Sequence, residues 1–232
     1  MSKYKYLLWD VDGTILDFLA AEKAAVKKLF LEYGFGECTD EMISKYSSIN
    51  LKYWKALERN EITKPQVLTG RFEEFFLSMG LPVEKVEAFN RDYQVALGDT
   101  IVFNDDSGEL LMKLKDDYFC AAITNGTKIA QNKKLERSGL DKIFDKIFIS
   151  EEIGVEKPNT EFFEKVFSEL KIRDLSEVLV IGDSLTSDIK GGNNAGVDTC
   201  WYNPLEKGNE FCEPVTYEIK NLWEIIGILA DN

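Results

Sequence analysis

The sequence predicts an α/β protein with a Rossmann-like core, built on a parallel sheet, and an inserted α-helical cap. Two patterns in the 232 residues support this prediction. Short apolar runs that end in polar residues alternate with helix-length amphipathic segments, which is typical of parallel sheets built from β-α-β units. Between the first and second runs, residues 17–97 have helical periodicity throughout and no strand-like run. Such an insertion indicates a separate helical bundle.

Five apolar runs are predicted to be strands buried on both faces, because they are nearly continuous and rich in β-branched and aromatic residues. These runs are residues 6–9, 119–123, 147–149, 178–181 and 199–202. Helices are predicted at roughly 127–139, 159–170 and 185–195. Right-handed crossovers would bring the carboxyl ends of the strands to one edge of the sheet, where ligands bind in folds of this kind. That edge would carry Asp10, Thr124, Ser150 and Asp183.

The inserted stretch is predicted to form four helices, because apolar residues recur at intervals of three and four and breakers interrupt the pattern. The breakers are Gly34-Phe35-Gly36, Lys64-Pro65 and Gly80-Leu81-Pro82. We therefore expect two domains. Residues 1–15 and 98–232 would form the core, and residues 16–97 a four-helix cap.

The composition excludes several classes of protein. There is no histidine, which rules out Ser–His and Cys–His catalysis and a zinc site of the HExxH type. Asp and Glu number 41 against 28 Lys and Arg, a formal charge of −13, so a nucleic-acid polymer is not an expected partner. No apolar run reaches the length of about 18 residues that a membrane span requires, and the amino-terminal residues do not resemble a signal peptide. We expect a cytoplasmic protein without a membrane partner.

The segment Asp10-Val11-Asp12-Gly13-Thr14 carries the strongest chemical signal. Two carboxylates two residues apart, directly after a buried strand, repel each other unless a cation relieves the repulsion. Mg²⁺ suits such ligands because it prefers hard oxygen atoms. The alternative, a turn capped by an Asp side chain, requires no cation.

Three further segments follow other predicted strands. Asp183 and Asp188 form a second acidic pair, and Asp183 comes within reach of the same ion if its strand neighbours the first; a helix cap is the alternative explanation of Asp188. Thr124-Asn125-Gly126 offers a hydroxyl group and backbone N–H groups at the start of a helix, which can bind an anion or simply cap the helix. Lys157 lies in a loop, and Pro158 restricts its backbone.

Taken in chain order, the four segments resemble the four signature motifs of the haloacid dehalogenase (HAD) superfamily, and the helical insert resembles its C1-type cap. The resemblance covers the chain from Tyr6 to Asp188. It implies that Asp10 attacks phosphorus and forms an aspartyl phosphate, and that Asp12 protonates the leaving oxygen and then deprotonates water. It also implies that Mg²⁺ binds the Asp10 carboxylate, the Asp12 carbonyl and Asp183, while Asp188 holds the water molecules of the metal or the motif lysine.

The same resemblance assigns phosphate binding to Thr124 and the Asn125 backbone, and neutralisation of charge to Lys157. Dehalogenases of the superfamily lack an acid at the position of Asp12, and the Asp-Gly-Thr form ending in Thr14 is typical of its phosphatases. The expected activity is a Mg²⁺-dependent phosphomonoesterase whose partner is a small phosphate ester. We expect a monomer or a weak dimer.

A closer resemblance, carried by residues 182–192 and 194–204, is to the YjjG/YfnB-type 5′-nucleotidases. It implies a nucleoside monophosphate substrate, either a pyrimidine or a non-canonical one. Substrate choice would then lie in the cap, where several side chains could stack on a base or bond to its edge. These side chains are Phe18, Asn50, Tyr53, Trp54 and Arg71. For Phe18, Tyr53 and Trp54 the alternative role is packing in the cap core, and for Arg71 it is an ion pair with a neighbouring acid.

Other functions use the same core. A sugar-phosphate phosphatase, a β-phosphoglucomutase-like phosphomutase and a pyrophosphatase are the enzymatic alternatives. A HAD core can also serve as a catalytically silent binding module, but such modules usually lose a motif residue. In this chain the motif residues are all present: Asp10, Asp12, Thr124, Lys157, Asp183 and Asp188.

Overall fold

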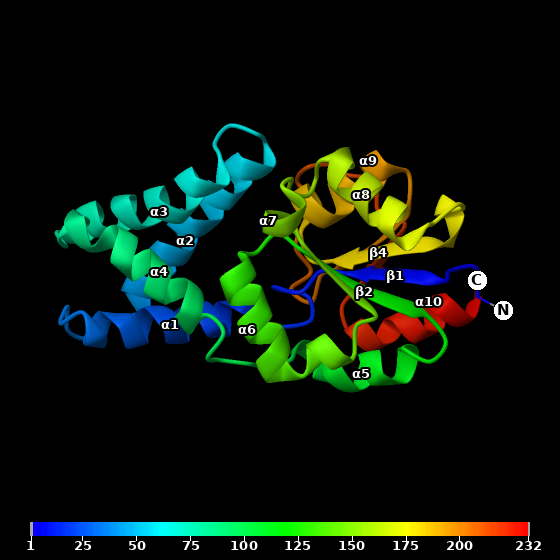
Figure 1. Ribbon diagram of the computed structural model, residues 1–232, viewed down its shortest axis with the longest axis horizontal. Helices are drawn as coiled ribbons and strands as arrows, with labels where there is room; N and C mark the ends of the chain where they lie inside the picture. Colours follow the sequence, from blue (N-terminus) through cyan, green and yellow to red (C-terminus); the bar gives the residue numbers. More distant parts are fainter. Residues whose placement is uncertain (1, 232) are drawn as a thin grey trace.

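One six-stranded sheet, entirely parallel, forms the centre of the computed structural model, which describes residues 2–231 (Figure 1). The strands are β1 (Tyr6–Trp9), β2 (Phe119–Thr124), β3 (Lys146–Ile149), β4 (Val178–Gly182), β5 (Asp198–Tyr202) and β6 (Tyr217–Ile219). Their order in the sheet is β3-β2-β1-β4-β5-β6, and each neighbouring pair is parallel. The five predicted strands and their parallel arrangement are confirmed.

Helices cover both faces of the sheet (Figure 1). Leu7 and Trp9 of β1 pack into an apolar cluster with residues of α5 and α10, while Leu8 packs into a second cluster with residues of α8. Because β1 is buried on both faces, its sequence is continuously apolar rather than alternating. The core helices are α5 (Ser107–Leu114), α6 (Lys128–Ser138), α7 (Ser150–Ile153), α8 (Thr160–Leu170), α9 (Lys190–Ala195) and α10 (Ile225–Asp231).

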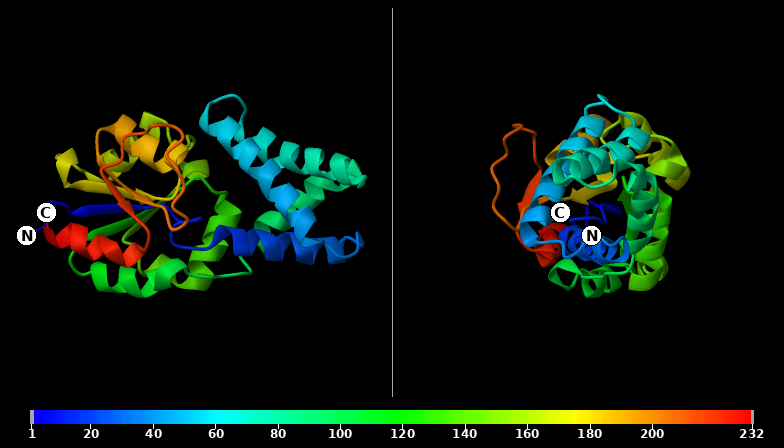
Figure 2. Two further views of the ribbon diagram at one scale, coloured as in Figure 1. Left: turned by 180° about the vertical axis from the view of Figure 1, so that it is seen from behind. Right: turned by 90° about the vertical axis from the view of Figure 1, so that its left-hand side faces the viewer.

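Four inserted helices form the cap, which lies at one end of the molecule (Figures 1 and 2). They are α1 (Phe18–Glu32), α2 (Asp40–Glu58), α3 (Lys64–Met79) and α4 (Val86–Ala96). Aromatic rings fill the interior of the cap: Phe72 stacks on Tyr46, and Phe89 and Tyr93 meet it edge-on. This apolar cluster is separate from those of the sheet, although it includes Ala130 of α6, so the cap has a core of its own that touches the core domain at α6.

Some elements differ from the sequence expectation. The elements β6, α5 and α10 were not predicted. The strand β6 has only three residues, with Glu218 at its centre, so it lacks the apolar run by which the other strands were predicted. The helix predicted at 185–195 begins as a π-helical turn, η5 (Leu185–Ile189), before continuing as α9. Short 3₁₀ turns are η1 (Val83–Lys85), η2 (Asn104–Asp106), η3 (Leu140–Lys142), η4 (Leu175–Glu177) and η6 (Leu222–Glu224). Within residues 2–231, no helix is both long and apolar enough to cross a membrane.

Candidate active site

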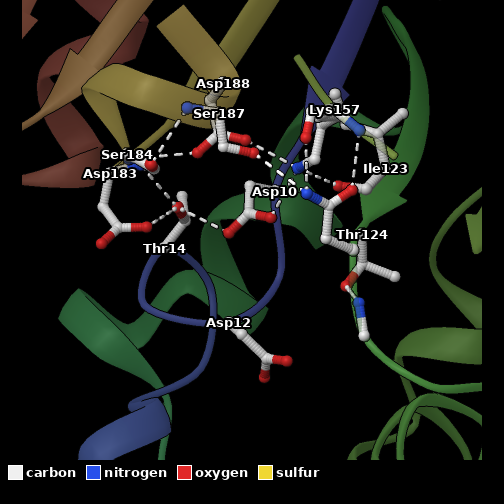
Figure 3. A network of polar contacts seen from close by, with 12 residues as sticks. Asp10, Asp12, Thr14, Ile123, Thr124, Lys157, Asp183, Ser184, Ser187 and Asp188 are labelled. Carbon is white, nitrogen blue, oxygen red and sulfur yellow. Dashed lines mark hydrogen bonds and ion pairs between the residues drawn. The ribbon is translucent and has the colours of Figure 1, made fainter. Parts of the chain in front are cut away.

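Three aspartates meet at the carboxyl ends of β1 and β4. The two strands are neighbours, with Trp9 paired to Ile181, so Asp10 and Asp183 follow adjacent strands. Asp188 lies on η5, and its side chain turns back to accept a hydrogen bond from the N–H of Ser184 at 3.1 Å. One carboxylate oxygen from each of the three aspartates lies within 4.8 Å of the other two (Figure 3). The juxtaposition expected from the order of the strands is therefore present.

Lys157 is the cation within this cluster. Its Nζ atom donates to Asp10 Oδ1 at 2.8 Å, to Asp188 Oδ1 at 2.6 Å and to the carbonyl oxygen of Ile123 at 2.7 Å. Burial alone would lower the pKa of Lys157, but the carboxylates of Asp10 and Asp188 outweigh it and raise that pKa. Lys157 therefore stays protonated at neutral pH and neutralises part of the buried negative charge.

Asn125 fixes the loop that carries Lys157. Its Nδ2 atom donates to the Lys157 carbonyl at 2.9 Å, and its Oδ1 atom accepts the Lys157 N–H at 2.9 Å. The same amide donates to the Ser187 hydroxyl at 3.2 Å. The Asn125 side chain is thus occupied in holding the lysine loop, a role that the sequence analysis did not assign to it. Thr124 is buried beside it, and its hydroxyl accepts the N–H of Gly126 at 3.2 Å.

Thr14 joins the loops after β1 and β4. Its buried hydroxyl lies 3.2 Å from Asp10 Oδ2 and accepts the Asp183 N–H at 3.0 Å. The preceding Gly13 has a φ of +96°, and a Cβ atom there would lie 2.8 Å from the Asp183 carboxylate oxygens. Glycine is therefore required twice at this position, for its backbone angle and for space.

The positive charge that the protein places near the three carboxylates is too small to balance their negative charge. Burial, followed by the charge of Asp188, raises the pKa of Asp183 to about 7. Burial also raises the pKa of Asp10 well above its usual range, despite the opposing effect of Lys157. A cluster of hard oxygen donors with excess negative charge suits a small divalent cation. The residues present therefore fit the Mg²⁺ ion that the sequence resemblance implies.

Asp12 lies apart from the other acids. Figure 3 shows its side chain pointing away from Asp10. Gln131 Nε2 donates to Asp12 Oδ2 at 2.6 Å, and Lys134 Nζ forms an ion pair with Asp12 Oδ1. The Asp12 carboxylate is thus not one of the three clustered carboxylates, and a metal contact through its backbone carbonyl stays a prediction. Gln131 and Lys134 belong to none of the four motifs, so the sequence analysis missed them.

Two of the predicted specificity residues lie inside the cap. Asn50 and Arg71 are only 3% and 2% exposed. Arg71 Nη1 donates to Asn50 Oδ1 at 2.7 Å, and Asn50 Nδ2 donates to Glu22 Oε2 at 2.7 Å. A direct contact with substrate would require these bonds to open, so the geometry gives this prediction no support. For Arg71 the sequence had left an ion pair with a neighbouring acid as the alternative role.

The remaining predicted cap residues are only partly buried. Phe18 is the first residue of α1, and its ring lies 5.2 Å from Lys134 Nζ. Trp54 and Tyr53 lie on α2, where Tyr53 packs against the cap cluster. Their role in substrate choice stays a prediction.

Two other cap residues reach the carboxyl edge of the sheet, and neither was singled out in the sequence. Glu58 at the end of α2 accepts a hydrogen bond from the Thr186 hydroxyl at 2.6 Å. Lys64 at the start of α3 donates to Ser150 Oγ at 2.8 Å and to the Gly126 carbonyl at 3.2 Å. The turn between α2 and α3 therefore docks beside the aspartate cluster.

Comparisons with known proteins agree with this geometry. Residues 7–202 match the family described as haloacid dehalogenase-like hydrolase. The chain is 37% identical over 231 residues to the pyrimidine 5′-nucleotidase PynA of Streptococcus pneumoniae, covering 99% of this chain and 96% of PynA. It is 30% identical over 228 residues to the pyrimidine 5′-nucleotidase YjjG of Escherichia coli, covering 98% of this chain and 99% of YjjG.

A solved structure is also similar over nearly the whole chain. The crystal structure of YfnB from Bacillus subtilis, bound to magnesium, superposes with a TM-score of 0.90 at 38% identity, covering 97% of this chain and 98% of YfnB. That structure reveals an interdomain movement in YfnB. The four motifs, the parallel core with its cap, and the near full-length relatives all agree: the chain belongs to the haloacid dehalogenase-like hydrolase family.

Proposed function

We propose that the protein is a Mg²⁺-dependent phosphomonoesterase that hydrolyses nucleoside 5′-monophosphates, pyrimidine nucleotides in particular, through an aspartyl phosphate on Asp10. The observation that carries the proposal is the cluster of Asp10, Asp183 and Asp188 around Lys157 at the carboxyl edge of the sheet. Support for the nucleotide comes from the relatives PynA and YjjG, which are pyrimidine 5′-nucleotidases.

Asp10 is oriented for attack before substrate arrives. Lys157 holds Oδ1 and Thr14 lies at Oδ2, so the carboxylate cannot rotate freely. Such fixed geometry removes part of the entropic cost of reaching the transition state. Mg²⁺ bound by Asp10, Asp183 and Asp188 would supply positive charge that stabilises the phosphoryl group during transfer.

The reaction then divides into two steps. Asp10 attacks phosphorus, the bond to the leaving oxygen breaks, and Asp12 gives that oxygen its proton. Water next attacks phosphorus and gives a proton to Asp12, while the bond to Asp10 breaks and phosphate is released. Lys157, Thr124 and the Asn125 N–H group lie at the same sheet edge and would hold the phosphoryl oxygens.

The cap completes the site when it closes. The docked α2–α3 turn, through Glu58 and Lys64, covers the sheet edge in this structure. A closed cap excludes water and brings the cap side chains to the leaving group. The interdomain movement of YfnB supports the same behaviour in this chain.

A substrate panel tests the proposal directly. Pyrimidine and purine nucleoside monophosphates, hexose phosphates and pyrophosphate would be assayed with Mg²⁺ for phosphate release, and the hexose phosphates also for isomerisation. We expect the highest kcat/KM for a pyrimidine nucleotide, and no release after EDTA treatment or in Asp10→Asn. Retained turnover in either control would overturn the covalent, metal-assisted mechanism. Isomerisation of a hexose phosphate without net phosphate release would favour a mutase. Absence of activity on every ester would favour a binding module.

A further inference from the structure

We propose that Gln131 and Lys134 of α6 are positioning residues for Asp12, holding its carboxylate in one orientation beside the phosphate site. The inference rests on the proposed function, in which Asp12 moves the proton. Gln131 bonds to one carboxylate oxygen and Lys134 to the other. An Asp side chain on a loop is otherwise free to rotate, and these two contacts fix both of its oxygens.

Helix α6 is placed so that both side chains reach the same carboxylate. Gln131 and Lys134 are three residues apart, which puts them on one face of the helix. Their exposed fractions are 0% and 1%, so neither is a solvated surface side chain. The sheet-edge loop and α6 are therefore connected by buried polar contacts.

Gly126 leaves room for the Gln131 contact. A Cβ atom at Gly126 would lie 2.1 Å from Gln131 Nε2, so the Gln131 amide would have to leave the position in which it bonds to Asp12. Gly126 does not have a positive φ angle, so a backbone requirement does not explain this glycine. Space for the Gln131 amide does explain it, and the glycine of the Thr124-Asn125-Gly126 motif thereby serves the acid of another motif.

The ion pair with Asp12 offsets the cost of burying Lys134. An ammonium group removed from water is costly unless it is paired. Within residues 2–231, the ammonium group of Lys134 pairs with the Asp12 carboxylate and lies 5.2 Å from the ring of Phe18. Phe18 begins the first cap helix, so the ammonium group lies between the proposed proton carrier and the entry to the cap.

The arrangement leaves Asp12 free to accept a proton from water. To protonate the leaving oxygen, Asp12 must first take up a proton from solvent. An ionised carboxylate has about four lone-pair sites, and the two contacts from α6 use one on each oxygen. The side chain of Asp12 remains 21% exposed, which leaves it accessible to a leaving oxygen or to water. The two contacts therefore restrict the orientation of Asp12 without enclosing it.

Steady-state kinetics on the best substrate of the panel test the inference. Lys134→Met and Gln131→Ala are expected to lower kcat by about tenfold to a hundredfold, the usual cost of misplacing a catalytic group, with KM changed less than about twofold. Lys134→Arg, which keeps the charge, should recover most of the kcat lost in Lys134→Met. Lys128→Met is the matched control, because Lys128 is an exposed lysine of the same helix paired with Glu152, and it should match wild type.

Two results would overturn the inference. One is a kcat for Lys134→Met within about twofold of wild type at a temperature where the variant is folded; a lower melting temperature alone would then mark the pair as merely structural. The other is a crystal structure of Lys134→Met in which the Asp12 carboxylate keeps its wild-type orientation. The crystal comparison needs no turnover, so it tests the positioning role even if wild type hydrolyses no ester and the proposed function fails.

Discussion

Thr14 is the residue through which the loops after β1 and β4 are joined, and its hydroxyl is the group to remove. Thr14→Val keeps the shape but leaves the buried Asp183 N–H without its acceptor. We expect a loss of about 1–2 kcal/mol in the free energy of unfolding and a fall in kcat/KM of about tenfold, since Asp10 loses a contact. Denaturant unfolding and kinetics measure the two effects. Thr14→Ser should resemble wild type, and a Val variant equal to wild type would show that the hydroxyl is dispensable.

The titration of Asp183 makes the stability of the metal-free protein depend on pH, and the pKa shift gives the sign of this dependence. Its pKa is about 7 in the folded chain, against 3.8 ordinarily. Between these values the folded state binds more protons than the unfolded state, so this contribution to stability falls as pH rises. Mg²⁺ binds the ionised carboxylates and should therefore raise the melting temperature more at about pH 8 than at about pH 5. Asp183→Asn should abolish most of that increase, whereas an equal effect of Mg²⁺ at both pH values would contradict the assignment.

At the carboxyl end of α2, the contact between Glu58 and Thr186 also depends on pH. Burial raises the pKa of Glu58 to about 7, from 4.5. Protonation of Glu58 thus accompanies folding between these values, and its contribution to stability is lost as pH rises through that window. Glu58→Gln removes the charge and keeps an acceptor for Thr186. We expect the variant to be more stable than wild type by about 1–3 kcal/mol near pH 8 and no more stable near pH 4.

Denaturant unfolding at the two pH values measures the difference between wild type and Glu58→Gln. Lys52→Met is a suitable control, because the exposed ion pair of Lys52 with Glu74 lies within the cap and should contribute little at either pH. If Glu58→Gln shows the same stability difference from wild type at both values, Glu58 does not titrate in this window.

The elements also show where sequence-based prediction of the site stops. The position of Asp10, Thr124 and Asp183 at the sheet edge was predictable, because each comes at the end of a short, nearly continuous apolar run and strand order brings such positions together. The contact of Lys134 with Asp12 was not visible, since it depends on how α6 packs against a loop 122 residues away in sequence. Asn50 was expected to contact substrate, because a helical pattern alone does not show which polar side chains face inward.

At the scale of the whole molecule, the cap and the core meet through contacts that can open. The cap has its own hydrophobic core, and Glu58 and Lys64 dock its α2–α3 turn onto the sheet edge by polar bonds. Beside the Lys64 contact with Gly126, the hydroxyl of Thr127 at the start of α6 donates to Gln94 Oε1 of α4 at 2.8 Å. Polar contacts of this kind contribute about 1 kcal/mol each. A pair of substitutions should therefore shift the equilibrium between the closed and open positions of the cap.

The combined variant Lys64→Met with Thr186→Val removes the hydrogen bond of Glu58 to Thr186 and every polar contact of Lys64 named above, and it leaves the apolar core of the cap intact. We expect a larger radius of gyration by small-angle X-ray scattering in the absence of substrate. The apparent KM should rise by about tenfold, because only the closed fraction binds productively and 1.4 kcal/mol corresponds to a factor of ten. Lys52→Met should change neither quantity. An unchanged radius together with an unchanged KM would mean that apolar contacts, not these polar ones, hold the cap against the sheet edge.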